Sequence, residues 1–87
     1  MNSAGHNSGL PVRFTRSSRK HKVGRVHALD VIDSVAPVEV AATDEFDARK
    51  VWIGLDDRGV ELEIVAVVLQ AELLVIHVMP TARRRKP

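Results

Sequence analysis

The chain contains no cysteine, only three aromatic residues and no long apolar run. Without cysteine it can form neither a disulfide nor a thiolate metal site. Its apolar stretches are far shorter than the about 18 residues that a membrane-spanning helix needs, and its N-terminus lacks the apolar run of a signal peptide. We therefore expect a cytoplasmic protein that makes no contact with a membrane.

The scarcity of aromatic residues also limits how the chain can bind single-stranded nucleic acid. The only platforms on which bases could stack are Phe14, Phe46 and Trp52. An extended binding surface of the OB or RRM type is therefore disfavoured. Gly54 and Gly59 flank a turn and fit neither nucleotide-binding fingerprint. His21 and His27 would diverge on a helix, so we expect no metal site and no cofactor.

Acidic residues are absent from residues 1–27, which carry six basic residues, and residues 83–86 add four more. Residues 28–82 hold all eleven acids and three basic residues, a net charge of −8 between ends that together carry +10. Basic ends attract polyanions such as nucleic acid by releasing condensed counterions. Such charge runs are commonly solvated tails. If the fold brings the two ends together, one face becomes a phosphate-binding surface instead.

The composition predicts one small domain between two tails. Residues 1–14 read as a disordered, basic N-terminal tail because they are small, polar and glycine-rich over most of their length. Residues 15–82 form a single α+β domain, and residues 83–87 a basic C-terminal tail. About 70 residues are close to the lower limit for a domain that folds without disulfides or metals. Help from a partner chain is consistent with this size.

The segment from Ser17 to Val35 has the apolar spacing of an amphipathic helix. Its stripe at positions i, i+3, i+4 and i+7 consists of Ala28, Val31, Ile32 and Val35. Pro37 prevents any continuation of the helix. The same helical wheel places His21 and Arg25 on the side of the stripe. Part of the N-terminal basic cluster would therefore lie at the end of the buried face.

Strand patterns follow the helix. The predicted strands are Val38–Val40, Lys50–Leu55, Val60–Leu69 and Leu73–Met79, with a hairpin turn at residues 56–59. Pairing Leu55 with Val60 puts Trp52 opposite Glu63, on the side of the sheet away from the shared apolar set. Strict alternation in the last strand sets Leu73, Val75, His77 and Met79 against Leu74, Ile76 and Val78. The expected architecture is an N-terminal helix packed on a three- to four-stranded antiparallel β-meander.

Two histidines are the best candidates for chemistry. His77 ends an apolar strand just before the chain turns basic, and His21 lies beside Lys20 on the side of the helix that carries Arg25. Each is either a structural histidine or a general acid or base, since the unperturbed pKa of histidine is nearest neutrality. RNA cleavage without a metal needs a base, an acid and a cation, which these residue types supply. Glu61 and Glu63 form either a carboxylate pair or, more ordinarily, a solvated strand edge.

The order of short motifs along the chain resembles the BrnT-like toxins, which belong to the RelE-like group of bacterial type II toxin–antitoxin systems. The resemblance covers about residues 15–86. It rests on Arg19-Lys20-His21-Lys22-Val23, Asp47-Ala48-Arg49, Ile53-Gly54, a hairpin, and Val75-Ile76-His77-Val78-Met79 before an arginine-rich end. The family implies a compact α/β ribonuclease fold, metal-independent cleavage of mRNA that arrests growth, and neutralisation by a DNA-binding antitoxin encoded beside the toxin.

By position, the resemblance carries family residues over to this chain. Lys20 and His21 match the Lys-His at the start of the family helix, and Arg49 matches the arginine of an Asp-Glu-Arg segment. The last strand of the family usually ends in Ile-Ser-Ala-Arg. The matching arginine is Met79 here, and the nearest replacement is Arg83.

The leading hypothesis is a toxin that cleaves mRNA and forms a hetero-oligomer with its antitoxin. Its candidate catalytic residues are His21, His77, Lys20 and Arg25. Its candidate RNA- and phosphate-binding residues are Arg19, Arg49, Arg83, Arg84 and Arg85. One alternative is an inactive binding module of the same fold, either a degenerate toxin or a protein-interaction domain. Another is an accessory protein that binds nucleic acid through its basic ends alone.

Overall fold

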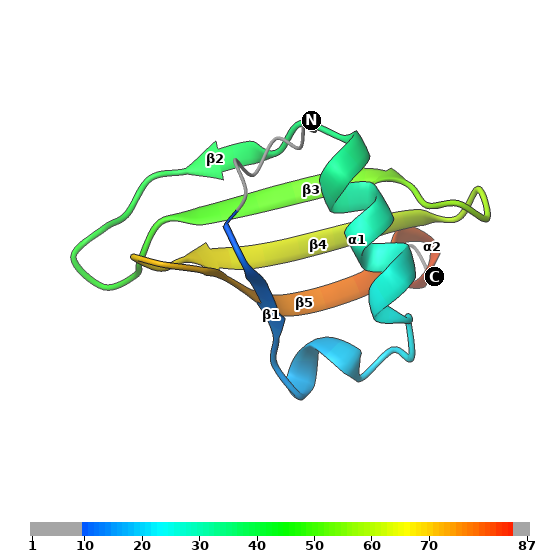
Figure 1. Ribbon diagram of the computed structural model, residues 1–87, viewed down its shortest axis with the longest axis horizontal. Helices are drawn as coiled ribbons and strands as arrows, with labels where there is room; N and C mark the ends of the chain where they lie inside the picture. The colour runs from blue at the N-terminus through cyan, green and yellow to red at the C-terminus, as the bar shows by residue number, and fades with distance from the viewer. Residues whose placement is uncertain (1–9, 85–87) are drawn as a thin grey trace.

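Five strands form one mixed sheet in the order β1-β5-β4-β3-β2 in the computed structural model, which describes residues 10–84 (Figure 1). The strands are β1 (Val12–Phe14), β2 (Val38–Val40), β3 (Arg49–Leu55), β4 (Glu61–Val68) and β5 (Leu73–Pro80). The last four pair antiparallel in chain order, whereas β1 pairs parallel with β5. The α+β class is confirmed. The sheet is larger than the predicted antiparallel meander and mixed in direction.

Strand β1 lies in the segment predicted to be a tail, so that prediction is wrong for Val12–Phe14. These residues pair with the free edge of β5, where Leu73 N–H donates to the Pro11 carbonyl (2.9 Å) and Thr15 N–H to the Val75 carbonyl (3.0 Å). Val12 and Phe14 also pack against the buried core. Two alternating apolar side chains and one open strand edge are enough to order this segment. The predicted C-terminal tail is wrong for Arg83 and Arg84, which end the short helix Thr81–Arg84. Residues 1–9 and 85–87 of the predicted tails lie outside the described residues.

Helix α1 spans Arg25–Ser34 and is shorter at its start than the helix predicted from Ser17. A 3-10 helix, η1 (Ser17–Arg19), occupies the first part of that segment. Lys22 then takes a left-handed conformation (φ 61°), and Gly24 is extended as the N-cap of α1. Left-handed backbone cannot continue a helix. The buried stripe is confirmed, because the fully buried residues of α1 are Ala28, Val31 and Ile32.

The β3–β4 hairpin is shifted by one position from the predicted register. Leu55 pairs with Glu61, and Trp52 therefore lies opposite Ile64 rather than Glu63. The turn needs the extra residue because the Asp56 carboxylate accepts hydrogen bonds from Val60 N–H (3.0 Å) and Arg58 N–H (2.8 Å). A shift of one residue exchanges the two faces of a strand. Trp52 is consequently fully buried under α1 instead of lying on the other face.

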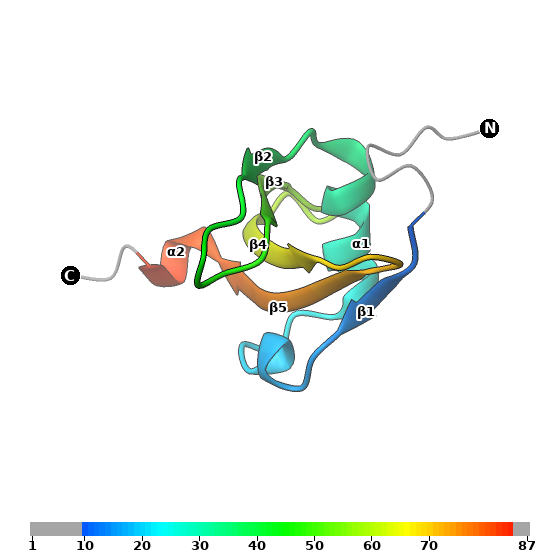
Figure 2. The same ribbon diagram turned by 90° about the vertical axis from the view of Figure 1, so that its left-hand side faces the viewer.

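The two faces of the sheet differ. Helix α1 covers one face, and the short helix α2 (Thr81–Arg84) lies on the opposite side, next to the ends of β4 and β5 (Figure 2). The buried residues of the sheet, all on the α1 side, are Trp52, Leu62, Ile64, Ala66, Leu73, Val75 and Val78. The opposite face, which we call the open face, keeps Ile53 (47% exposed) and Leu55 (60% exposed) accessible. No helix within residues 10–84 is long and apolar enough to cross a membrane.

Candidate functional site

An irregularity in β5 turns His77 toward the open face. Val75 and Val78 are both buried, although strict alternation would place them on opposite faces. The register resolves this: Val75 pairs with Ala66 and His77 with Val65, which leaves Ile76 as the extra residue of a β-bulge. The predicted alternation of this strand is therefore wrong beyond Val75. The bulge buries Val78 under α1 and leaves the His77 side chain 35% exposed on the other side.

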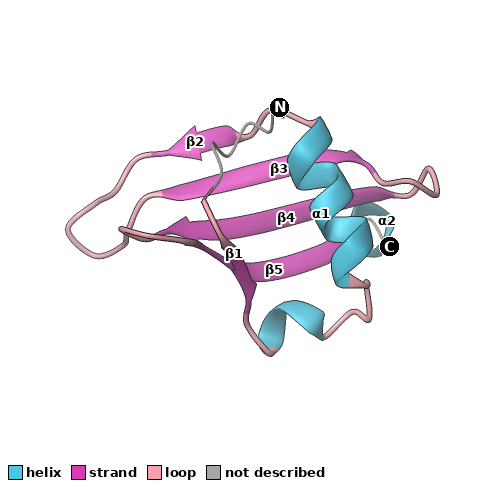
Figure 3. Cartoon of the chain, in the orientation of Figure 1, coloured by secondary structure: helices cyan, strands magenta, loops and turns pink. Residues whose placement is uncertain are grey.

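The segment between β1 and α1 brings His21 to His77. This segment, residues 15–24, runs past the edge of β5 through η1 (Figure 3). It is fixed at one end by Ser18, whose hydroxyl donates to the Thr15 carbonyl (2.6 Å), and at the other by the buried side chain of Val23. His21 lies between these two anchors. Its ring meets that of His77 edge to face, with the ring centroids 6.4 Å apart and the planes at 78°.

The surroundings of His21 are cationic. Partial burial lowers its pKa below the usual 6.5, and the charges of Arg83, Lys20 and His77 lower it further. Arg83 belongs to α2, directly after β5, and Lys20 to the end of η1. Residues from the two basic ends of the chain therefore act on the same imidazole. Because its pKa is lowered, His21 is neutral near pH 7 and can accept a proton.

Glu63 lies at the site through a contact with His77, whereas the sequence pattern indicated only a carboxylate pair with Glu61 or a solvated strand edge. Its carboxylate oxygen Oε1 lies 3.5 Å from His77 Nε2, and its side chain is only 14% exposed. The two side chains join β4 and β5 on the open face. Glu61, by contrast, accepts a hydrogen bond from the Thr81 hydroxyl (2.6 Å). The two glutamates alternate with the buried Leu62 along β4, which was the available signal that both face His77's side of the sheet.

Arg25 does not share an element with His21, as the predicted helix required. It is the first residue of α1, and its guanidinium lies over the Phe14 ring, 5.4 Å from the centroid. Arg19 and Arg25 both line an open groove beside β1. The prediction that His21 and Arg25 lie on one helical face is therefore wrong, because the chain between them is not helical.

The other predicted phosphate-binding residues are spread over the molecule. Arg49 begins β3 and lies over the Phe46 ring, 4.9 Å from the centroid. It is separated from β5 by β4, and the register places it on the open face, opposite Val67. Arg84 is the last residue of α2, and Arg85 lies outside the described residues.

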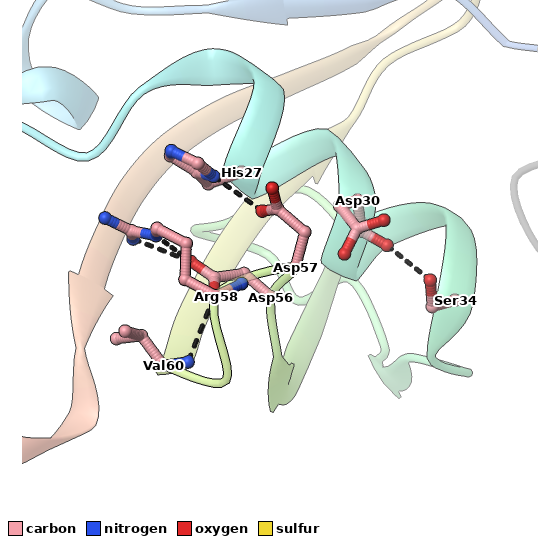
Figure 4. Close-up of polar contacts among 7 residues, drawn as sticks. All are labelled: His27, Asp30, Ser34, Asp56, Asp57, Arg58 and Val60. Atoms are coloured by element: carbon pink, nitrogen blue, oxygen red, sulfur yellow. Dashed lines mark hydrogen bonds and ion pairs between the residues drawn. The ribbon is translucent and has the colours of Figure 1, made fainter.

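One cluster in residues 10–84 brings three potential metal-ligand atoms within 4.8 Å of one another, those of His27, Asp56 and Asp57. Figure 4 shows how the β3–β4 turn uses them. His27 Nδ1 pairs with Asp57 at 2.6 Å, which ties α1 to the turn. Both oxygens of Asp56 accept hydrogen bonds, from Arg58 and from Val60 N–H. These contacts close the hairpin and explain the cluster without a metal.

Comparisons of the chain with protein-family models, with curated proteins and with solved structures found no match. Two histidines in contact, with two cations and one carboxylate around them, form a site suited to proton transfer at an anionic group.

Proposed function

We propose that this protein is a metal-independent endoribonuclease that acts as the toxin of a bacterial type II toxin–antitoxin system, as its resemblance to the BrnT-like toxins implies. The observation that carries the proposal is the contact between His21 and His77 in a cationic setting. Its partners would be mRNA and a DNA-binding antitoxin in the cytoplasm, where the antitoxin forms a hetero-oligomer with the toxin.

The geometry supports a division of roles between the two histidines. Neutral His21 takes the proton of an RNA 2′-hydroxyl, and the oxygen attacks the adjacent phosphorus. The bond from phosphorus to the 5′-oxygen breaks, and His77, which lies 3.5 Å from Glu63, acts as the general acid that gives a proton to that oxygen. The products are a 2′,3′-cyclic phosphate and a 5′-hydroxyl. This step uses neither a water molecule nor a metal ion. Lys20 and Arg83 stabilise the charge of the phosphorane.

The position of Arg83 also supports the proposal. Met79 occupies the position where the family has an arginine, and it pairs with Glu63 on β4. Arg83, four residues further along the chain and in α2, acts electrostatically on His21. A cation is thus supplied next to the histidine pair from α2 instead of from the strand.

Cleavage of an end-labelled RNA by the purified protein in the presence of EDTA tests the proposal. The expected products carry a cyclic phosphate, and His21→Gln or His77→Gln lowers the rate by about 10²-fold or more, as loss of a general acid or base does. His27→Gln is the matched control, because His27 pairs with Asp57 at the hairpin turn. Equal rates for the wild type and the double histidine variant, or cleavage only after a divalent metal is added, would contradict the mechanism.

The open face favours a second candidate, a binding module of the same fold without catalysis. Four apolar side chains on this face are exposed: Val38, Val40, Ile53 and Leu55. Grouped apolar exposure of this kind marks surfaces that contact other proteins. Induced expression in bacteria separates the two candidates. Growth arrest that survives His21→Ala with His77→Ala supports the binding module, and arrest that is lost supports the nuclease.

A further inference from the structure

The groove beside β1 is a second place where arginines and an aromatic ring meet. It has a volume of about 340 Å³, within the range of clefts that hold small ligands. Its walls are formed by Pro11, Val12, Arg13, Phe14, Arg19, Arg25 and Glu72. These residues come from β1 and the residue before it, from η1, from the start of α1 and, in the case of Glu72, from the turn before β5.

The charge of the groove is positive after its own ion pair is counted. Arg13 binds Glu72 through two hydrogen bonds, of 3.1 and 2.7 Å, which neutralises both. Within residues 10–84, neither Arg19 nor Arg25 forms an ion pair. The N-terminus of α1, which begins at Arg25, adds partial positive charge. Two guanidinium groups are therefore available to an anionic ligand.

Phe14 gives one of these guanidinium groups a defined position. The Arg25 guanidinium lies over its ring at 5.4 Å from the centroid, a cation–π arrangement. Phe14 itself is partly buried against the core and so is a fixed support. A positioned guanidinium binds a phosphate with less loss of side-chain freedom than a freely rotating one.

The groove is connected to the histidine pair by consecutive residues of the chain. Arg19 lines the groove, and the next residue, Lys20, contributes to the field at His21. Consecutive residues lie about 3.8 Å apart along the backbone. Arg19 at the groove and Lys20, which acts on His21, are therefore neighbouring cations in the chain. A polymer with a phosphate at every unit fits a row of cations arranged in this way.

We propose that Arg19 and Arg25 form a subsite that binds a backbone phosphate of single-stranded RNA outside the bond that the histidine pair cleaves, with Phe14 as the positioning residue of Arg25. The inference rests on the proposed function, and it replaces the catalytic role expected of Arg25 with a role in substrate binding. Single-stranded RNA fits better than an acidic peptide because Arg19 in the subsite is followed in the chain by Lys20, which acts on the candidate base His21.

Binding of a 2′-O-methyl RNA octamer tests the subsite without cleavage, since this probe lacks the attacking hydroxyl. The affinity is measured by fluorescence anisotropy at salt concentrations from about 50 to about 300 mM, and each phosphate contact to a single strand adds about 0.7 to the slope of log K against log salt. We expect Arg19→Gln and Arg25→Gln each to reduce the slope by about 0.7. Arg16→Gln, which removes an exposed arginine outside the groove lining, is the matched control.

Phe14→Leu tests the positioning role and should weaken binding of the octamer, because leucine offers no ring to the Arg25 guanidinium. Phe14→Trp should keep the affinity of the wild type, because tryptophan also accepts a cation over its ring. Equal loss of slope in Arg16→Gln and Arg25→Gln would overturn the subsite, because it would mean a diffuse basic surface. Competition by polyglutamate that depends equally on Arg25 would overturn the choice of RNA. With unmodified RNA, Arg25→Gln should raise KM for an octanucleotide more than for a dinucleotide. Octamer binding that depends on Arg19 and Arg25 without any cleavage would support the subsite and contradict the nuclease.

Discussion

Replacement of Gly54 by alanine tests the register of the β3–β4 hairpin and the close approach of α1 to it. Gly54 faces α1, and a Cβ built on it would lie 2.5 Å from Val35 Cγ2 and 3.6 Å from Val31 Cγ1. The first distance is far shorter than a van der Waals contact, so either Val35 or the whole of α1 must move. In the register predicted from the sequence, Trp52 lies opposite Glu63. Trp52 and Gly54 would then both face away from the main apolar set.

The size of the effect follows from two opposing contributions. Overpacking a core costs about 1–3 kcal/mol. Alanine is better than glycine inside a strand by about 0.5–1 kcal/mol, which offsets part of this cost. We expect Gly54→Ala to lower the free energy of unfolding by about 1–2 kcal/mol, which for a domain of this size lowers Tm by about 4 to 15 °C.

Urea unfolding followed by the fluorescence of Trp52 measures this change. Trp52 is the only tryptophan and is fully buried, so its emission reports the same interface. Val35→Ala removes the methyl group that would clash and serves as the matched variant. If the clash is real, the double variant Gly54→Ala with Val35→Ala is more stable than the sum of the single changes predicts, by about 1 kcal/mol or more.

A single Gly54→Ala variant as stable as the wild type, or more stable, would refute the reasoning. Strand preference alone would then decide the outcome, and α1 would not approach Gly54 closely. The register that buries Trp52 would be wrong as well. Trp52 would then lie opposite Glu63 on the open face, as the sequence pattern predicted.

Three further predictions concern the site and its supports. Because the pKa of His21 is lowered in the folded protein, the unfolded chain binds a proton at this imidazole more readily. The free energy of unfolding should therefore fall as the pH drops from about 7 to about 5. His21→Gln should flatten this pH dependence in urea titrations. Burial would raise the pKa of Asp56, but hydrogen bonds from Arg58 and Val60 lower it overall, so its stabilisation is present above about pH 4 and lost in more acidic solution. Asp56→Asn should cost about 2 kcal/mol at pH 7, and an unchanged urea midpoint would contradict that role. Ile53→Lys should change the free energy of unfolding by less than about 0.5 kcal/mol, because Ile53 is exposed, and a larger loss would mean that the open face is covered.

The α+β class, the buried stripe of α1 and the positions of four strands were predictable because they depend on local periodicity. The hairpin register was not, because it depends on hydrogen bonds to one carboxylate. Asp56 adds a residue to the turn, and no periodic signal in the flanking strands reports that insertion. The bulge at Ile76 was missed for a similar reason, since a run of apolar residues shows no preferred face.

The candidate site was predictable as residue types and not as an arrangement. His21, His77 and Arg83 were chosen for their chemistry and their place near the basic ends. Their convergence depends on the parallel pairing of β1 with β5 and on the left-handed backbone at Lys22. Both features depend on tertiary structure, and no local pattern in the sequence indicates them. The contact of Glu63 with His77 lies between β4 and β5, depends on the bulge at Ile76, and was missed with that bulge.

The pairing of β1 with β5 joins residues about sixty positions apart, for example Phe14 with Val75. Contacts of such long range form slowly, because a large loop must close before they contribute stability. The contact between His21 and His77 forms after this loop has closed, because His21 reaches His77 only once β1 has paired with β5. During synthesis, β5 and Arg83 leave the ribosome after every other part of the sheet. A nascent chain therefore carries His21 and Lys20 long before it can bring them next to His77 and Arg83.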